Sequence, residues 1–130
     1  MSLVVANALS KTYRAGDVDV PALRGVDFSI EPGAFVAFVG PSGSGKSTIL
    51  NMIGGLDKPS VGTLTVLGTD IASLDRSAAA NFRGTNLGFI FQDFNLIPVL
   101  SAYENIEYPL LMVQDWQETK RRARVTELLA

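Results

Sequence analysis

The sequence contains no cysteine and no histidine, and these two absences remove several kinds of chemistry. Without cysteine the chain has no disulfide and no thiolate metal site. Without histidine it lacks the commonest general base and the commonest metal ligand of proteins at neutral pH. Any reaction that this chain supports must therefore depend on other side chains or on the backbone.

Long apolar runs and an excess of positive charge are also missing. No apolar stretch approaches the ~18 residues needed to span a bilayer, and the N-terminus lacks the basic and apolar segments of a signal peptide. The net charge is −2, whereas a nucleic-acid-binding protein usually presents a basic face. The one dense basic run, Lys120–Arg124, is interpreted as a solvated helix face. We therefore expect a soluble, cytoplasmic chain without a nucleic-acid partner.

The 130 residues, of which 47% are hydrophobic, fit one small globular domain. In the first half, Val26, Phe28 and Ile30 alternate with polar residues, which predicts a half-buried strand. The run Phe35–Val39 is apolar throughout, as in a strand buried on both faces. A glycine-rich loop and a helix over Thr48–Ile53, ended by Gly54, follow it. The order of strand, loop and helix is typical of the opening of an α/β fold.

The other predicted elements are shorter or less regular. Strands are predicted at Leu3–Ala6, Thr63–Leu67 and Leu87–Phe91. A helix over Leu74–Arg83 is expected to end at Gly84, and a loop at Phe94–Leu100 precedes a helix at Tyr103–Glu107 that is capped by Ser101 and broken or kinked by Pro109. The last element is an amphipathic helix at Trp116–Ala130, with Trp116, Ala123, Leu128 and Leu129 on one side.

The glycine-rich loop matches the phosphate-binding pattern G-x-x-x-x-G-K-S/T and consists of Gly40, Pro41, Ser42, Gly43, Ser44, Gly45, Lys46 and Ser47. A triphosphate needs backbone N–H donors around it, and glycines let the backbone approach without a Cβ in the way. The following helix points its positive dipole end at the same anion. Lys46 adds a point charge, and the Ser47 hydroxyl is a hard oxygen ligand suited to Mg²⁺.

A glycine-rich turn that happens to precede a lysine is the alternative interpretation of this pattern. The predicted strand before the loop and the predicted helix after it are the context in which the pattern binds phosphate. We therefore predict a site for ATP, or a close relative of ATP, with Mg²⁺.

Beyond the loop, the chain resembles the ATPase domain of ABC transporters over nearly its whole length. Gly40–Thr48 resembles the Walker A motif of that family. The resemblance implies that Tyr13 stacks on adenine. It also implies that Gln92, at the end of Phe89–Gln92, contacts Mg²⁺ and the attacking water and acts in catalysis with Lys46. The stretch Phe91–Pro98 is similar to the branch that serves lipoprotein release and macrolide export.

Other motifs of the family have no counterpart in these 130 residues. The signature motif, the Walker B strand with its carboxylates and the switch histidine are all absent. The resemblance therefore implies an incomplete P-loop NTPase fold, with an N-terminal β-rich part and the start of a helical subdomain. On this interpretation residues 1–130 are a nucleotide-binding domain truncated before the signature motif.

The sequence leaves more than one functional hypothesis open. The leading one is the ATPase subunit of an ABC transporter, which pairs with a second nucleotide-binding domain and with a transmembrane permease at the inner membrane. The alternative is a nucleotide-binding module that does not hydrolyse ATP, and we expect this of the 130-residue chain itself. A third, a small kinase or GTPase, is disfavoured because the guanine-reading Asn-Lys-x-Asp is absent and the Tyr13 and Gln92 pair is not expected there.

Overall fold

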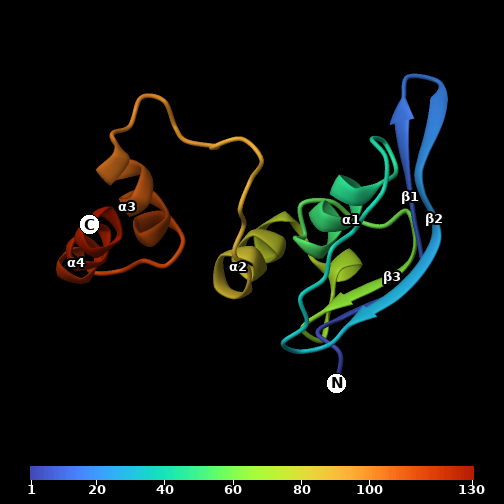
Figure 1. The fold of residues 1–130 in the computed structure, drawn as a ribbon, viewed down its shortest axis with the longest axis horizontal. Coiled ribbons are helices and arrows are strands. Elements are labelled where there is room, and N and C mark those ends of the chain that lie inside the picture. Colours follow the sequence, from blue (N-terminus) through green and yellow to red (C-terminus); the bar gives the residue numbers. More distant parts are fainter. The chain divides into compact units, whose positions relative to one another are not determined.

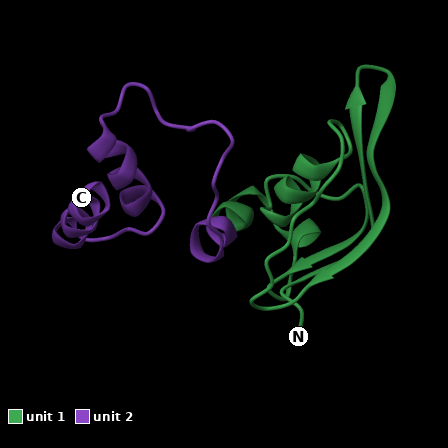
Figure 2. Cartoon of the chain, viewed as in Figure 1, with its two compact units in different colours: residues 1–80 green, residues 81–130 purple.

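The computed structural model describes all of residues 1–130. They form two compact units, residues 1–80 and residues 81–130 (Figure 2). The first unit is rich in β-structure and the second contains only helices and irregular segments. None of the helices has the length and apolar character that crossing a bilayer requires.

A four-stranded antiparallel sheet forms the frame of the first unit, with the order β2-β1-β3-β4 (Figure 1). Its strands are β1 (Val4–Ala15), β2 (Val18–Ile30), β3 (Val61–Val66) and β4 (Thr69–Asp70). The first two strands form a long hairpin in which Ala15 pairs with Val18. The predicted strands near residues 3–6, 26–30 and 63–67 are confirmed, and the first two are longer than predicted.

One face of this sheet is covered by helix α1 (Lys46–Ile53), which packs against β3. The helix ends at Gly54, as predicted. Its inward side chains join those of the strands and of the short 3-10 helix η1 (Ile71–Ser73) in one apolar core, made of Val4, Ala6, Leu9, Leu23, Ile49, Met52, Leu64, Val66 and Ile71. Each large side chain fully buried in this way contributes about 1.5–3 kcal/mol, so the core fixes α1 on the sheet.

Two predicted strands are absent from the structure, and these predictions are wrong for this chain. Phe35–Val39 and Leu87–Phe91 have no strand hydrogen bonds, and Phe35 and Ile90 are fully exposed. An apolar run forms a strand only when neighbours accept and donate its backbone hydrogen bonds. No strand in residues 1–130 pairs with either run.

Helix α2 (Arg76–Asn86) begins in the first unit and ends in the second. The prediction that it ends at Gly84 is wrong, because the helix continues through that glycine to Asn86. Beyond it, Leu87 still donates its backbone N–H to the Arg83 carbonyl. A glycine in the left-handed conformation often ends a helix, but Gly84 is not among the glycines with positive φ.

Two helices, α3 (Ala102–Met112) and α4 (Glu118–Leu129), pack together in the second unit. The predicted cap at Ser101 is confirmed as a capping box with Glu104. Pro109 lies inside α3, which continues to Met112. Backbone hydrogen bonds from Asn105 and Val113 span the helix on either side of the proline.

The predicted apolar side of α4 is wrong. Ala123, Leu128 and Leu129 are exposed, and the buried residue of the helix is Val125. An ion pair at 3.1 Å between Arg121 and Glu107 joins α4 to α3. This pair is a second contact of α4, beside the burial of Val125.

The basic run Lys120–Arg124 is largely solvated, as predicted. Arg122 and Arg124 make exposed ion pairs with Glu118 and Glu127 on the same helix. The Lys120 ammonium lies 3.9 Å from the centroid of the Trp116 ring. The charges of this run are therefore satisfied within the second unit.

Candidate functional site

The loop Gly40–Ser47 leads directly into the first turn of α1. Gly45 is the N-cap of the helix and has φ 95°, and Gly43 has φ 78°. Both values lie in the left-handed region that side chains with a Cβ avoid. No side chain caps the helix, so none competes for the N–H groups of its first turn. This arrangement presents positive dipole ends to an anion.

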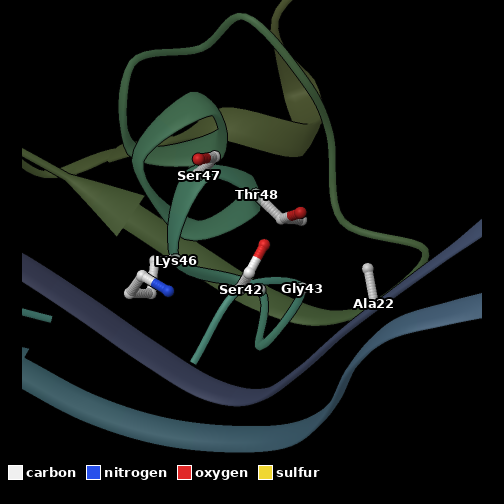
Figure 3. A pocket seen from close by; sticks show the side chains of 7 residues that line it. Ala22, Ser42, Gly43, Lys46, Ser47 and Thr48 are labelled. Carbon is white, nitrogen blue, oxygen red and sulfur yellow. The ribbon is translucent and has the colours of Figure 1, made fainter. Parts of the chain in front are cut away.

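A pocket with a volume of about 570 Å³ opens at this loop. The backbone and hydroxyl groups around it come from the loop and the first turn of α1. Figure 3 shows the Ser42 hydroxyl rising from the loop toward that turn. The residues that line the pocket are Ala22, Ser42, Gly43, Gly45, Lys46, Ser47 and Thr48. Apart from Ala22 of β2, all were predicted from the sequence as phosphate- or metal-binding residues.

The Lys46 side chain folds back over its own loop. Its ammonium donates hydrogen bonds to the carbonyl oxygens of Gly40 and Pro41, both at 2.7 Å, and to the Ser44 hydroxyl at 3.3 Å. These contacts hold the positive charge beside the pocket that Lys46 lines. A phosphate oxygen that binds Lys46 must compete with these acceptors, and its full negative charge makes the stronger hydrogen bond.

Tyr13 lies near the end of β1, with 39% of its surface exposed. Its hydroxyl donates a hydrogen bond of 2.7 Å to Asp57, and the Lys11 ammonium lies 4.9 Å from its ring centroid. The hydrogen bond to Asp57 and partial burial raise the pKa of Tyr13 above its usual value, while the Thr48 hydroxyl opposes the shift.

Asp57 follows α1 and accepts hydrogen bonds from three groups. They are the Lys11 ammonium, the Tyr13 hydroxyl and the Lys58 backbone N–H. Burial alone raises the pKa of Asp57, but these bonds outweigh it, and the pKa lies below its usual value. The stabilisation from this depressed pKa is present above the unfolded-state value and is lost as the pH falls through the folded-state value.

Gln92 belongs to the second unit, where it is exposed. It follows Phe89 and Phe91, whose rings stack with centroids 5.7 Å apart. The pocket lies in the first unit, so the predicted contact of Gln92 with Mg²⁺ and water stays a prediction.

Sequence reasoning did not identify Lys11 and Asp57. Lys11 stands two residues before Tyr13 on the same strand, and side chains at that spacing share a face. This spacing was the one available signal for Lys11. Asp57 and Tyr13 are 44 positions apart in the sequence, and no local sequence pattern predicts a hydrogen bond between residues at that separation.

Comparison with known proteins relates this site to one family. The family model described as ABC transporter matches residues 23–130. The macrolide export ATP-binding/permease protein MacB of Marinobacter nauticus is 42% identical over 127 residues, which cover 98% of this chain and 20% of the relative. The lipoprotein-releasing system ATP-binding protein LolD of Anaeromyxobacter dehalogenans is 47% identical over 108 residues, which cover 83% of this chain and 45% of the relative.

A solved structure resembles the fold as well. The ATP-binding cassette MJ0796, in a dimeric post-hydrolysis state bound to ADP and Pi, superimposes with a TM-score of 0.87 at 42% identity. The match covers 95% of this chain and 54% of that cassette. The chain thus spans about half of the solved cassette and a smaller part of these two curated relatives.

A glycine-rich loop that opens a helix, with a lysine and a serine at its end, defines the class of P-loop nucleotide-binding proteins. Within this class the chain belongs to the ABC transporter family, whose ATPases bind ATP. The predicted fold class, part of an ABC ATPase of the P-loop NTPase fold, is confirmed.

The geometry of the loop predicts different costs for alanine at its two left-handed glycines. A Cβ on Gly43 meets no atom within 4 Å, whereas a Cβ on Gly45 lies 2.7 Å from the Ala22 carbonyl oxygen. We expect Gly43→Ala to lower the free energy of unfolding by about 1–2 kcal/mol from backbone strain. Gly45→Ala should cost about 1–3 kcal/mol more because the backbone must also move. Urea unfolding of both variants measures this difference, and equal losses would contradict the described loop.

Proposed function

We propose that this chain binds Mg-ATP in the pocket at Gly40–Thr48 and forms the first part of the nucleotide-binding domain of an ABC transporter. The observation that carries this proposal is the pocket at the uncapped N-terminus of α1, lined by Lys46 and by hydroxyl groups. Such a surface complements the charge and the many acceptor oxygens of a triphosphate. Family membership supports ATP as the nucleotide.

The roles of the site residues follow from their chemistry. Lys46 neutralises phosphate charge, and the loop N–H groups surround the phosphates. The Ser47 hydroxyl is a suitable oxygen ligand for Mg²⁺, whose charge would offset that of the phosphates. No group of three or more acidic, histidine or cysteine side chains that could hold a metal is present in the structure. We assign Gln92 to the same ion and to the attacking water, and Tyr13 to the base.

Replacing Lys46 with alanine tests the phosphate site. The change removes charge-assisted hydrogen bonds, which are worth ~1.5–3 kcal/mol, and should weaken binding of Mg-ATP by ~10–100-fold. Isothermal titration calorimetry measures the affinity. Lys120→Ala, in the second unit, is the matched control and should bind as the unchanged chain does. Unchanged affinity in a folded Lys46→Ala variant would refute the proposed site.

For the whole transporter, we propose a transmembrane permease and a second nucleotide-binding domain as partners. MacB is described as an export ATP-binding/permease protein, and LolD as the ATP-binding protein of a lipoprotein-releasing system. The solved MJ0796 cassettes are dimeric. By this analogy the chain serves a system of the macrolide-export or lipoprotein-release type, at the cytoplasmic face of the inner membrane.

The loop Asp93–Leu100 is our candidate for the contact with the permease. Phe94, Leu96 and Val99 are 93%, 63% and 89% exposed, and clustered apolar exposure indicates a binding surface. In the full-length parent, a cysteine at Leu96 should cross-link to a cytoplasmic loop of the permease. A cysteine at Val61, also exposed, is the control and should not react. Cross-linking that fails from each position of the loop would remove this role.

A second candidate function is a module that binds nucleotide without hydrolysing it. No carboxylate is among the residues that line the pocket, and the sequence has no histidine. General-base catalysis contributes ~10²–10⁴-fold to rate, so the 130-residue chain should release no phosphate above background at saturating Mg-ATP. Lys46→Ala is the blank for contaminating ATPase. A rate above that blank that grows with the square of protein concentration would mean that two copies complete a site.

A further inference from the structure

The backbone and the side-chain hydroxyl of Tyr13 are held by two separate parts of the first unit. Its backbone pairs with Val20 of β2 in the hairpin, and its hydroxyl donates to Asp57 at 2.7 Å. Tyrosine side chains at a strand end are usually free to change rotamer in solvent. Here the hydrogen bond at the tip of the ring restricts that freedom, so the orientation of the ring depends on Asp57.

Asp57 is itself fixed, and the group that fixes it is Lys11. The Lys11 side chain is only 12% exposed and the Asp57 side chain 26%. The Lys11 ammonium forms an ion pair with one oxygen of Asp57, while the other oxygen accepts from Tyr13. The same ammonium also donates to the Lys58 carbonyl at 2.7 Å. A charged group that is largely buried keeps such partners because losing them is costly.

This network is attached to the helix that carries the phosphate-binding loop. The backbone N–H groups of Leu56 and Asp57 donate to the Asn51 carbonyl, in the last turn of α1, at 2.8 and 3.3 Å. Asp57 thereby connects the C-terminal end of α1 to the Tyr13 ring, while the N-terminal end of the same helix bears Lys46 and Ser47. One short rigid helix therefore relates the ring to the phosphate site.

Lys11 also restricts which side of the ring is available. Its ammonium lies 4.9 Å from the ring centroid, in the geometry of a cation–π contact. A cation over one face of an aromatic ring occupies that face. A planar base that stacks on Tyr13 must then use the opposite face.

We propose that Asp57 is a positioning residue for the nucleotide base, which acts by holding the Tyr13 ring at a fixed place relative to the phosphate-binding loop. Lys11 supports it as counter-ion and covers the second face of the ring. The proposal rests on the proposed function, in which Tyr13 contacts the base of ATP. Since every base has a π-face, the effect should be similar for other purine triphosphates.

The test compares Mg-ATP with Mg-tripolyphosphate, which has the three phosphates but no nucleoside. Calorimetry on the 130-residue chain measures both affinities for Tyr13→Ala, Tyr13→Phe, Asp57→Ala and the double variant Tyr13→Phe/Asp57→Ala. Tyr13→Phe and Asp57→Ala should each weaken ATP by about 3–10-fold, the loss expected from one hydrogen bond. Neither should change the affinity for tripolyphosphate. The double variant should bind ATP no more weakly than Asp57→Ala alone, because the bond that Tyr13→Phe removes is already lost in Asp57→Ala.

Two further variants complete the design. Asp57→Asn keeps an oxygen that can accept from the Tyr13 hydroxyl, so it should bind ATP more tightly than Asp57→Ala does. Asp17→Ala, in the exposed hairpin turn, removes a carboxylate from the same unit and should change neither affinity. Circular dichroism melting shows whether each variant is folded. Tyr13→Phe and Asp57→Asn carry the test if Asp57→Ala does not fold.

The outcomes separate this inference from the proposed function. If Asp57→Ala weakens both ligands equally, Asp57 only supports the loop fold and the inference is refuted. If Tyr13→Ala weakens ATP selectively but Tyr13→Phe and Asp57→Ala do not, the base contact stands and the positioning role is refuted. If Tyr13→Ala leaves ATP binding unchanged, the proposed base contact fails and the inference fails with it. Loss of binding in Lys46→Ala tests the phosphate site independently.

Discussion

The burial of helix α1 against the sheet is the interaction on which the rest of the first unit depends. Ile49 and Met52 hold the helix in the apolar core, and this fixes both of its ends in space. The N-terminal end presents Gly45, Lys46 and Ser47 at a pocket. A helix that was free to tilt could not keep its N–H groups pointed at one anion. Anion binding at this end of α1 therefore depends on the packing of α1 against the sheet.

The C-terminal end of the same helix explains a second group of contacts. The chain leaves α1 at Gly54 and reaches Asp57, which binds residues of β1 through its two oxygens. The phosphate-binding loop, α1 and the end of β1 are thus connected by successive contacts, and each contact restricts the movement of the segments that it joins. In the proposed function the loop binds the phosphates and Tyr13 the base, and the fixed helix sets the distance between these two surfaces before the nucleotide binds.

The two apolar segments that do not form strands show the opposite situation. Phe35–Val39 and Leu87–Phe91 have the composition of strands buried on both faces, yet they remain irregular and largely exposed. Apolar side chains favour burial, but a strand exists only as a partner of another strand. None of the four strands of the antiparallel sheet forms backbone hydrogen bonds with these segments, although the ring of Phe38 contacts that of Phe28 in β2. Both segments have the composition of buried strands, but residues 1–130 provide no strand that pairs with them.

Several features were determined by the sequence alone because their physics is local. The phosphate-binding loop is encoded by glycines and a lysine at fixed spacing, the helix after it is ended by Gly54, and the Ser101 cap requires only Glu104 three residues later. Strand alternation at Val26, Phe28 and Ile30 is local in the same sense.

What only the tertiary structure decided are the features that depend on residues far apart in the chain. They include the missing partners of the two apolar segments, the side of α4 that is buried, and the bond between Tyr13 and Asp57. The continuation of α2 through Gly84 belongs with them, because a glycine permits the left-handed turn that often ends a helix but does not enforce it. Local pattern fixes which conformations a segment favours, and long-range packing decides which of them finds its partners.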